Sequence, residues 1–191
     1  MAGKQAKIIT ASELRRLLSY ARQGPTPERD VVIILLSVRA GLRACEIAGL
    51  DWSMVTDSNR RLSPLMELRD DIAKKGSGRR IPLHPELKSA LTALRPAGKR
   101  DGPVVVSLRG GPMRANSVVN WFISAFRAVG AVGCSSHSGR RTFVTMAARS
   151  AHKAGASLRD VQLLAGHRSI ETTQRYIDGD SSAQHRLVRG L

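Results

Sequence analysis

The pattern of apolar and polar positions begins with an amphipathic segment. Leu14 and Leu17 recur at helical spacing and would line one face of a helix over residues 11–22. Thr10 and Glu13 stand three positions apart at its start, the spacing of a capping box in which each side chain accepts from the other's backbone N–H. The pattern therefore predicts a first helix with a defined beginning.

A second, more apolar helix follows a break at Gly24-Pro25. Thr26 is expected to cap it, and Pro27 suits the first helical position, where a backbone N–H has no partner in the helix. Residues 31–36 are apolar on too many sides for a surface helix, so they predict the centre of the core. Gly41 ends this helix, and a short third helix is expected directly after it.

The pattern then changes to short apolar runs separated by turns. We expect a small antiparallel sheet of three strands, at 54–55, 65–72 and 80–83. Residues 74–78 form the tight connection between the last two strands, which places a cation on a mobile hairpin tip. The remaining elements are a short extended segment at 104–106 and helices at 85–94, 116–129, 137–150, 158–165 and 170–178. The predicted fold class is α+β, mainly α-helical.

Positive charge is in large excess. The 191 residues include 31 Lys and Arg against 15 Asp and Glu, a formal net charge of +16. Such a charge favours a polyanionic partner and speeds encounter with it. A GC-rich genome, which favours Arg codons, would explain the preference for Arg over Lys, but not the net excess. With 42% hydrophobic residues, this length suits one core rather than two full domains.

Cysteines and apolar runs exclude two other classes of protein. Cys45 and Cys134 lie far apart without a CxxC spacing, so we expect buried, reduced side chains rather than a zinc or redox site. The most apolar run, 31–38, is far shorter than the roughly 20 residues that a membrane span requires. No signal peptide opens the chain. A soluble, intracellular protein without membrane contact is expected.

Six scattered side chains have the chemistry needed around one phosphate. Arginine forks match phosphate oxygens, lysine can deliver a proton, histidine can accept or donate one, and tyrosine can act as a covalent nucleophile. The candidates are Arg43, Lys75, His137, Arg140, His167 and Tyr176. Tyr20, the other tyrosine, lies in the first predicted helix. This set suits cleavage of a nucleic-acid backbone without a metal ion.

Each candidate also lies in a local frame that resembles the tyrosine recombinase (phage integrase) family. The frames, in the family's order, are Gly-Leu-Arg-Ala-Cys-Glu-Ile at 41–47, Lys-Gly at 75–76 before Arg-Ile-Pro-Leu at 80–83, His-Ser-Gly-Arg at 137–140, and Leu-Ala-Gly-His at 164–167, nine residues before Tyr176. The resemblance implies the DNA breaking-rejoining fold of the family's catalytic domain over residues 10–180. A flexible basic tail at 1–9 and a C-terminal tail at 181–191 would flank it.

The resemblance also implies an activity, type IB strand exchange on DNA. Tyr176 would attack the scissile phosphate, Arg43 and Arg140 would stabilise its oxygens, and Lys75 would protonate the leaving 5′ oxygen, which leaves a 3′-phosphotyrosyl link. The first histidine of the set would exchange a proton near the tyrosine, and the second would hydrogen-bond the phosphate. Because the covalent link keeps the free energy of the phosphodiester, neither metal, ATP nor another cofactor is expected.

Two positions near this set stay open. Lys74 is adjacent to Lys75 and the hairpin can be read in either register, although the Lys-Gly pair of the family favours Lys75. Glu46 resembles the acidic residue that often follows the family's first arginine by three positions. It would orient its neighbours, or it would form a simple surface pair with Arg43 or Arg39.

The chain departs from the family in three respects. Gly139 stands where a leucine is common, and Arg141 stands where a histidine is common. Most members carry an N-terminal core-binding domain of roughly a hundred residues that closes around the DNA, and this chain begins almost at the catalytic domain. The chain is expected to be either a naturally short recombinase or a fragment of a longer one, and the starting Met favours the short form.

The expected function is therefore a site-specific recombinase or integrase of a mobile genetic element, acting on double-stranded DNA in the bacterial or phage-infected cytoplasm, at the nucleoid. A monomer in solution, a tetramer on DNA and an accessory DNA-bending or directionality factor are expected with it. The alternative is a DNA-binding regulator that keeps the fold with little strand exchange of its own. A covalent DNA adduct would separate the two.

Overall fold

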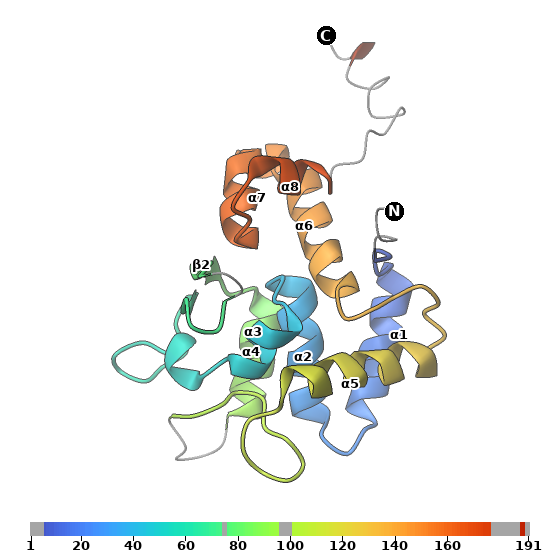
Figure 1. Ribbon diagram of the computed structural model, residues 1–191, viewed down its shortest axis with the longest axis vertical. Helices are drawn as coiled ribbons and strands as arrows, with labels where there is room; N and C mark the ends of the chain where they lie inside the picture. The colour runs from blue at the N-terminus through green and yellow to red at the C-terminus, as the bar shows by residue number, and fades with distance from the viewer. Residues whose placement is uncertain (1–5, 74–75, 96–100, 177–187, 190–191) are drawn as a thin grey trace. The chain divides into compact units, whose positions relative to one another are not determined.

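The computed structural model describes residues 6–73, 76–95, 101–176 and 188–189. The chain divides into two compact units, Met1–Phe143 and Val144–Leu191, and each is described by itself. The first unit contains the N-terminal helices and the small sheet, and the second contains the C-terminal helices (Figure 1).

Helix α1 (Ala11–Arg22) begins at the predicted capping box. The Thr10 N–H donates to Glu13 Oε2 at 2.8 Å, and the Glu13 N–H donates to Thr10 Oγ1 at 3.2 Å. Lys7 Nζ forms an ion pair with Glu13 Oε1 at 2.7 Å. The hydrogen bond from Lys7, followed by those from Thr10, lowers the pKa of Glu13 to about 2. The predicted first helix and its start are confirmed.

Helix α2 (Pro27–Arg39) forms the centre of the core of the first unit, as predicted. Residues 32–38 are all buried, and α1 and α4 (Pro85–Leu94) pack against α2 (Figure 1). Thr26 occupies the N-cap position, but its side chain accepts no backbone hydrogen bond. The expected Thr26 cap is wrong because the hydroxyl donates instead to Asp30 Oδ1, at 3.1 Å.

A glycine ends α2 where the sequence predicts it. Gly41 has a φ of +65°, a conformation that side-chain-bearing residues rarely adopt. A Cβ at this position would clash with the ring of Phe143. The predicted third helix follows as α3 (Ala44–Gly49), with Arg43 as its N-cap residue, and packs against α5 (Ala115–Ala128).

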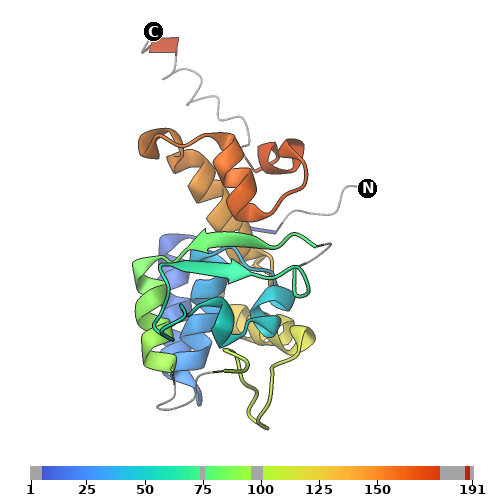
Figure 2. The ribbon, with the colours of Figure 1, turned by 90° about the vertical axis from the view of Figure 1, so that its left-hand side faces the viewer.

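Within the described residues, the sheet has two strands. β1 (Leu65–Leu68) and β2 (Arg79–Pro82) pair antiparallel, with Leu68 opposite Arg79 (Figure 2). Successive residues of a strand face opposite sides, and Ile81 is the buried position of β2. Arg79, two residues before Ile81, therefore shares its inward face.

The expected third strand at 54–55 is wrong. This part of the chain is a 3₁₀ helix, η1 (Trp52–Met54), because Asp51 caps it: the Ser53 N–H donates to Asp51 Oδ1 at 2.9 Å. At the expected extended segment 104–106, Val106 forms an isolated antiparallel bridge with Pro112, and Pro103, directly before the segment, forms one with Asp51.

The remaining predicted helices are present. α4, α5, α6 (Ser138–Ser150) and α7 (Leu158–Ala165) match their expected ranges to within one residue. α8 (Ile170–Gln174) ends earlier than the expected 170–178, because the Tyr176 N–H bonds to Thr173 O at 3.0 Å in a tighter turn. Residues 177–178 lie outside the described part of the chain. Within that part, no helix has the length and apolarity needed to cross a membrane.

The two cysteines are free thiols, and their burial differs from the expectation. Cys45 is exposed and Cys134 is half-buried. In the short helix α3 only one side faces the core: Glu46, Ile47 and Ala48 are buried, whereas Cys45 points to the other side. The prediction of two buried cysteines is therefore wrong.

Candidate active site

In the first unit, Arg43 and Glu46 form the first hydrogen-bonded pair of the candidate site. The Arg43 N–H donates to Glu46 Oε2 at 2.9 Å, and Arg43 Nη1 donates to Glu46 Oε1 at 2.7 Å. The side chain of Glu46 is fully buried and that of Arg43 is 19% exposed. Glu46 is thus no surface partner of Arg43. It holds both the backbone and the guanidinium of that arginine.

A second arginine, from β2, completes this cluster. Arg79 Nη1 donates to Glu46 Oε1 and Arg79 Nη2 donates to Glu46 Oε2, each at 3.0 Å. Arg39, the other expected partner of Glu46, instead pairs with Glu86 at 2.7 Å. Burial raises the pKa of Glu46, but the hydrogen bonds and charge of Arg79, and then of Arg43, bring this pKa below its ordinary value. The buried carboxylate is therefore ionised.

Arg140 lies in the first turn of α6 and is anchored to the same stretch of chain as Arg43. Its side chain is buried, and Nη1 donates to the carbonyl oxygen of Gly41 at 2.6 Å. Gly41 precedes Arg43 by two residues. Arg140 is thus anchored two residues from Arg43, at the short segment 41–43.

Close packing of two helices makes this approach of Arg140 feasible. A Cβ at Gly139 would clash with Ser37 Oγ and would lie 2.8 Å from Ser37 Cβ. Phe143 covers Gly41 one turn later along α6. The glycine that replaces the family's common leucine at 139 is therefore required here by the contact between α6 and α2.

His137 is exposed and lies immediately before α6. Its carbonyl oxygen accepts from the Arg141 N–H at 2.9 Å, and its own N–H donates to Ser135 Oγ at 3.3 Å. Its backbone is therefore tied into the first turn of the helix that carries Arg140. The described contacts hold the backbone of His137, while its side chain is exposed to solvent.

His167 and Tyr176 lie together in the second unit. Gly166 ends α7 in the left-handed conformation, with a φ of 62°, and His167 follows. The rings of His167 and Tyr176 stack, with centroids 5.5 Å apart and planes inclined by 22°. His167 Nδ1 lies 2.9 Å from the hydroxyl of Thr173, a fully buried residue. α7 and α8 thus place an oriented imidazole against the phenol.

The backbone around His167 is also fixed. Gln162 Nε2 donates to His167 O at 2.9 Å, and the His167 N–H donates to Gln162 O at 3.1 Å. Arg159 Nη1 in turn donates to Gln162 Oε1 at 2.8 Å. A buried glutamine therefore holds the turn that presents the histidine.

Lys75, and Lys74 beside it, lie outside the described residues, so their assignment stays a prediction. After them, the Gly78 N–H donates to Asp70 Oδ1 at 2.8 Å, which closes the base of the connection between β1 and β2. Of the six candidates, Arg43, His137 and Arg140 belong to the first unit, and His167 and Tyr176 belong to the second.

The sequence reasoning missed two residues. Arg79 could have been found from its spacing, because it stands two positions before the apolar Ile81 in a strand and so shares its buried face. Thr173 lies three residues before Tyr176, one helical turn away, but a threonine at this spacing has no distinctive signal. Both act on a candidate residue, Arg79 through Glu46 and Thr173 directly on His167.

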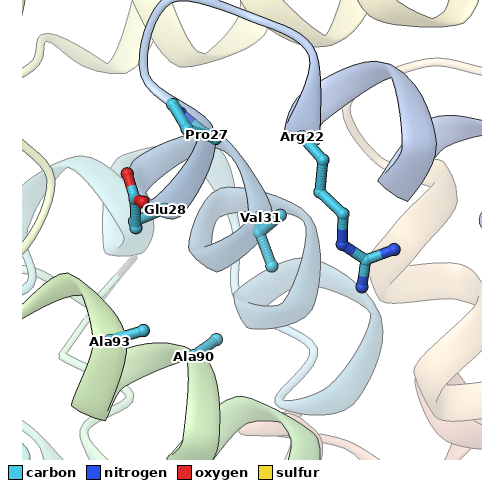
Figure 3. Close-up of a pocket in the computed structure, with 6 residues that line it drawn as sticks. All are labelled: Arg22, Pro27, Glu28, Val31, Ala90 and Ala93. Carbon is cyan, nitrogen blue, oxygen red and sulfur yellow. The ribbon is translucent and has the colours of Figure 1, made fainter.

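A pocket of about 190 Å³ lies in the first unit between the start of α2 and α4 (Figure 3). It is lined by Arg22, Pro27, Glu28, Val31, Ala90 and Ala93, none of which is a candidate site residue. Small-molecule sites usually measure roughly 300–1,000 Å³. At about 1.5 Å per helical residue, the pocket lies roughly 15 Å from the Gly41 end of α2. It is therefore separate from the arginine cluster.

Within the described residues, no group of His, Cys, Asp and Glu could hold a metal ion.

Comparisons with known proteins agree with one another. The chain matches the Phage integrase family over residues 7–182. It is 34% identical over 165 residues to the tyrosine recombinase XerC of Mycobacterium sp. (strain KMS), an alignment that covers 83% of this chain and 52% of that protein. It is 32% identical over 165 residues to XerC of Nitrobacter winogradskyi, covering 80% of this chain and 46% of that protein. The chain therefore spans about half the length of the curated relatives it matches.

A solved structure shares the fold. The Tn1549 transposon integrase in complex with circular intermediate DNA aligns with a TM-score of 0.74 at 21% identity, covering 100% of this chain and 69% of that chain. At this identity, the likeness shows a shared fold.

Proposed function

Since this chain belongs to the phage integrase family, the tyrosine recombinases, we propose that it acts as a site-specific recombinase that cuts and rejoins double-stranded DNA. The observation that carries the proposal is the anchoring of two arginines at one segment. Glu46 holds Arg43, and Arg140 donates to Gly41 O, two residues away. Paired guanidinium groups are suited to the oxygens of one phosphate.

The proposed cleavage step forms one bond and breaks another. Tyr176 Oη attacks the scissile phosphorus, the bond to the 5′ oxygen breaks, and a 3′-phosphotyrosyl bond forms. His137 accepts the phenol proton, and Lys75 gives a proton to the leaving 5′ oxygen. Rejoining reverses these transfers with a 5′ hydroxyl as the nucleophile, so the phosphodiester is regenerated without ATP.

The remaining candidates bind the phosphate while its charge builds up. Arg43 and Arg140 donate to the non-bridging oxygens. His167, whose ring Thr173 orients through Nδ1, donates to one of them. The stacking of His167 on Tyr176 supports this assignment, since it brings phosphate donor and nucleophile side by side.

The partner that we propose is double-stranded DNA. A formal net charge of +16 favours a polyanion, and the Tn1549 integrase of the same fold is bound to DNA in its solved structure. Exchange between two duplexes cuts four strands, and each chain carries one Tyr176. We therefore propose a monomer in solution that assembles into a tetramer on two DNA sites.

Nicked suicide duplexes test the function. A library of such duplexes with random core sequences is incubated with the protein, and covalent adducts are recovered by denaturing electrophoresis. An adduct formed by the wild-type protein and abolished by Tyr176→Phe supports the recombinase. Tyr20→Phe is the control and should leave the adduct intact. Sequence-specific binding with no adduct from any duplex would reject the enzyme in favour of a DNA-binding regulator.

A further inference from the structure

We infer that Arg79 is a positioning residue for the proposed cleavage: through Glu46, it keeps Arg43 both in place and available as a positive charge. The inference rests on the proposed function, since it concerns the same phosphate. Arg79 itself does not reach the DNA, because its side chain is only 5% exposed. Arg79 acts on Arg43 through the buried carboxylate of Glu46.

The geometry of Glu46 leaves little freedom in this cluster. Oε1 accepts from Nη1 of Arg43 at 2.7 Å and from Nη1 of Arg79 at 3.0 Å. Oε2 accepts from the Arg43 N–H at 2.9 Å and from Nη2 of Arg79 at 3.0 Å. A carboxylate has about four lone-pair sites, so these four donors fill them. The forked contact of Arg79 fixes the carboxylate plane, and that plane fixes Arg43.

Charge gives Arg79 a second role. A buried Glu46 paired with Arg43 alone would make a neutral pair and would weaken the attraction of Arg43 for a phosphate. Arg79 adds a second positive charge, so the cluster of two arginines and one glutamate carries a net charge of +1. Because the cluster is largely buried, water screens its net positive charge only weakly. Arg79 therefore compensates the negative charge of Glu46, so that the positive charge of Arg43 is not cancelled.

Stability alone explains such a cluster poorly. Buried ion pairs are often no more stabilising than apolar residues of similar volume, because the desolvation of the charges opposes their attraction. The neighbouring Arg80 offers the contrast: it faces solvent on the same strand and pairs with an exposed Glu67 at 3.0 Å. Arg80→Met is thus a matched control for Arg79→Met, with the same change in charge and side-chain length.

The first test measures cleavage at saturating concentrations of a suicide duplex that the wild-type protein cleaves, so that differences in binding drop out. Arg79→Met should form the adduct about 10- to 100-fold more slowly, while the Kd for the duplex changes less than about 3-fold. Arg79→Lys keeps the charge without the fork and should lie between. Arg80→Met should cleave at the wild-type rate. An Arg79→Met protein that matches the wild-type rate overturns the inference.

A second substrate separates positioning from misfolding. In a duplex whose scissile phosphate carries a methyl group in place of one non-bridging oxygen, the phosphate is uncharged and needs less stabilisation by arginine. If Arg79 acts through Arg43, the defect of Arg79→Met should shrink about 10-fold on this substrate. A defect equal on both substrates is one of folding and overturns the inference. If Arg79→Met does not fold, Arg79→Lys carries the same comparison.

A third measurement needs no DNA. In protein labelled with ¹⁵N-arginine, the side-chain N–H signals of Arg43, assigned with Arg43→Lys, should be protected from exchange in the wild type and in Arg80→Met. They should lose this protection in Arg79→Lys. Unchanged protection overturns the inference. If no duplex yields an adduct, the proposed function fails, while this measurement still decides whether Arg79 holds Arg43.

Discussion

The buried hydroxyl of Thr173 lies 2.9 Å from Nδ1 of His167. This contact orients the imidazole ring, because it involves Nδ1 and so sets the direction of Nε2. Partners of this kind commonly set the orientation and tautomer of a functional histidine. Thr173 is therefore expected to influence His167 through the orientation of its ring.

Thr173→Val removes this contact at nearly constant volume. We expect adduct formation at saturating duplex to slow about 10-fold, because His167 loses its fixed orientation. Single-turnover gels give the rate, and ¹⁵N spectra of the histidine ring report the tautomer. Thr172→Val is the control, since Thr172 Oγ1 contacts only an exposed serine hydroxyl at 3.4 Å among the described bonds. Equal rates for the two variants would refute the role of Thr173.

Arg140→Met should harm both activity and stability. It removes a proposed phosphate donor, so we expect adduct formation to fall about 100-fold or more. It also removes a buried donor to Gly41 O, which should lower the free energy of unfolding by about 1–3 kcal/mol. Urea titrations measure the second effect. Arg149→Met, at an exposed position of the same helix, should change neither quantity, and a full-rate Arg140→Met would remove this arginine from the proposed site.

Gly139→Ala tests the contact between α6 and α2. The added Cβ would clash with Ser37 Oγ, so we expect the free energy of unfolding to fall by about 1–3 kcal/mol. Ser37→Gly in the same protein should restore part of the loss, because it removes the atoms in contact. Gly24→Ala, whose Cβ would meet neighbours at 3.4 Å or more, is the control for adding a methyl group. A stable Gly139→Ala protein without the second change would contradict the packing described above.

Acid should destabilise the first unit through Glu13. The folded-state pKa of Glu13 is about 2, below the ordinary 4.5, chiefly because of Lys7. Its stabilising effect is therefore complete above pH 4.5 and is lost as the pH falls toward about 2. Urea unfolding at pH 6 and pH 3 should show a smaller drop in Glu13→Gln than in the wild type. Glu67→Gln provides the control, and a Glu13→Gln protein with the wild-type drop would disprove the linkage.

Binding of duplex DNA should depend steeply on salt. Contacts to phosphates release counterions, so the logarithm of the binding constant should fall linearly with the logarithm of salt concentration, with a slope of about −0.9 for each phosphate neutralised. Fluorescence anisotropy between 50 and 300 mM potassium chloride measures this slope. A slope near zero would exclude an electrostatic mode of binding.

Local signals in the sequence were sufficient for most helices. The capping box at Thr10 and Glu13, and the apolar run in α2, each concern neighbours within one or two turns, and both were confirmed. The predictions of local structure failed where a side chain could form either of two alternative hydrogen bonds. Thr26 bonded to Asp30 instead of the backbone, and Asp51 capped a 3₁₀ turn in place of a strand.

The site was less accessible to such reasoning. Resemblance to a family supplied the six candidates, but the contacts that orient them join distant positions: Glu46 to Arg79 across 33 residues, and Arg140 to Gly41 across 99. No periodicity within one element reports such contacts. The fully buried Glu46 shows this directly, because its sequence neighbours alone also allowed a surface pair.

Glu46 links the closing of a helix turn to the orientation of a side chain. The carboxylate that closes the first turn of α3, by accepting from the Arg43 N–H, is the same group that holds the Arg43 guanidinium. A newly synthesised chain in which this turn has not yet closed would lack the oriented guanidinium as well. The proposed cleavage would thus require the folded first turn of α3, because that turn and the Arg43 side chain share one carboxylate.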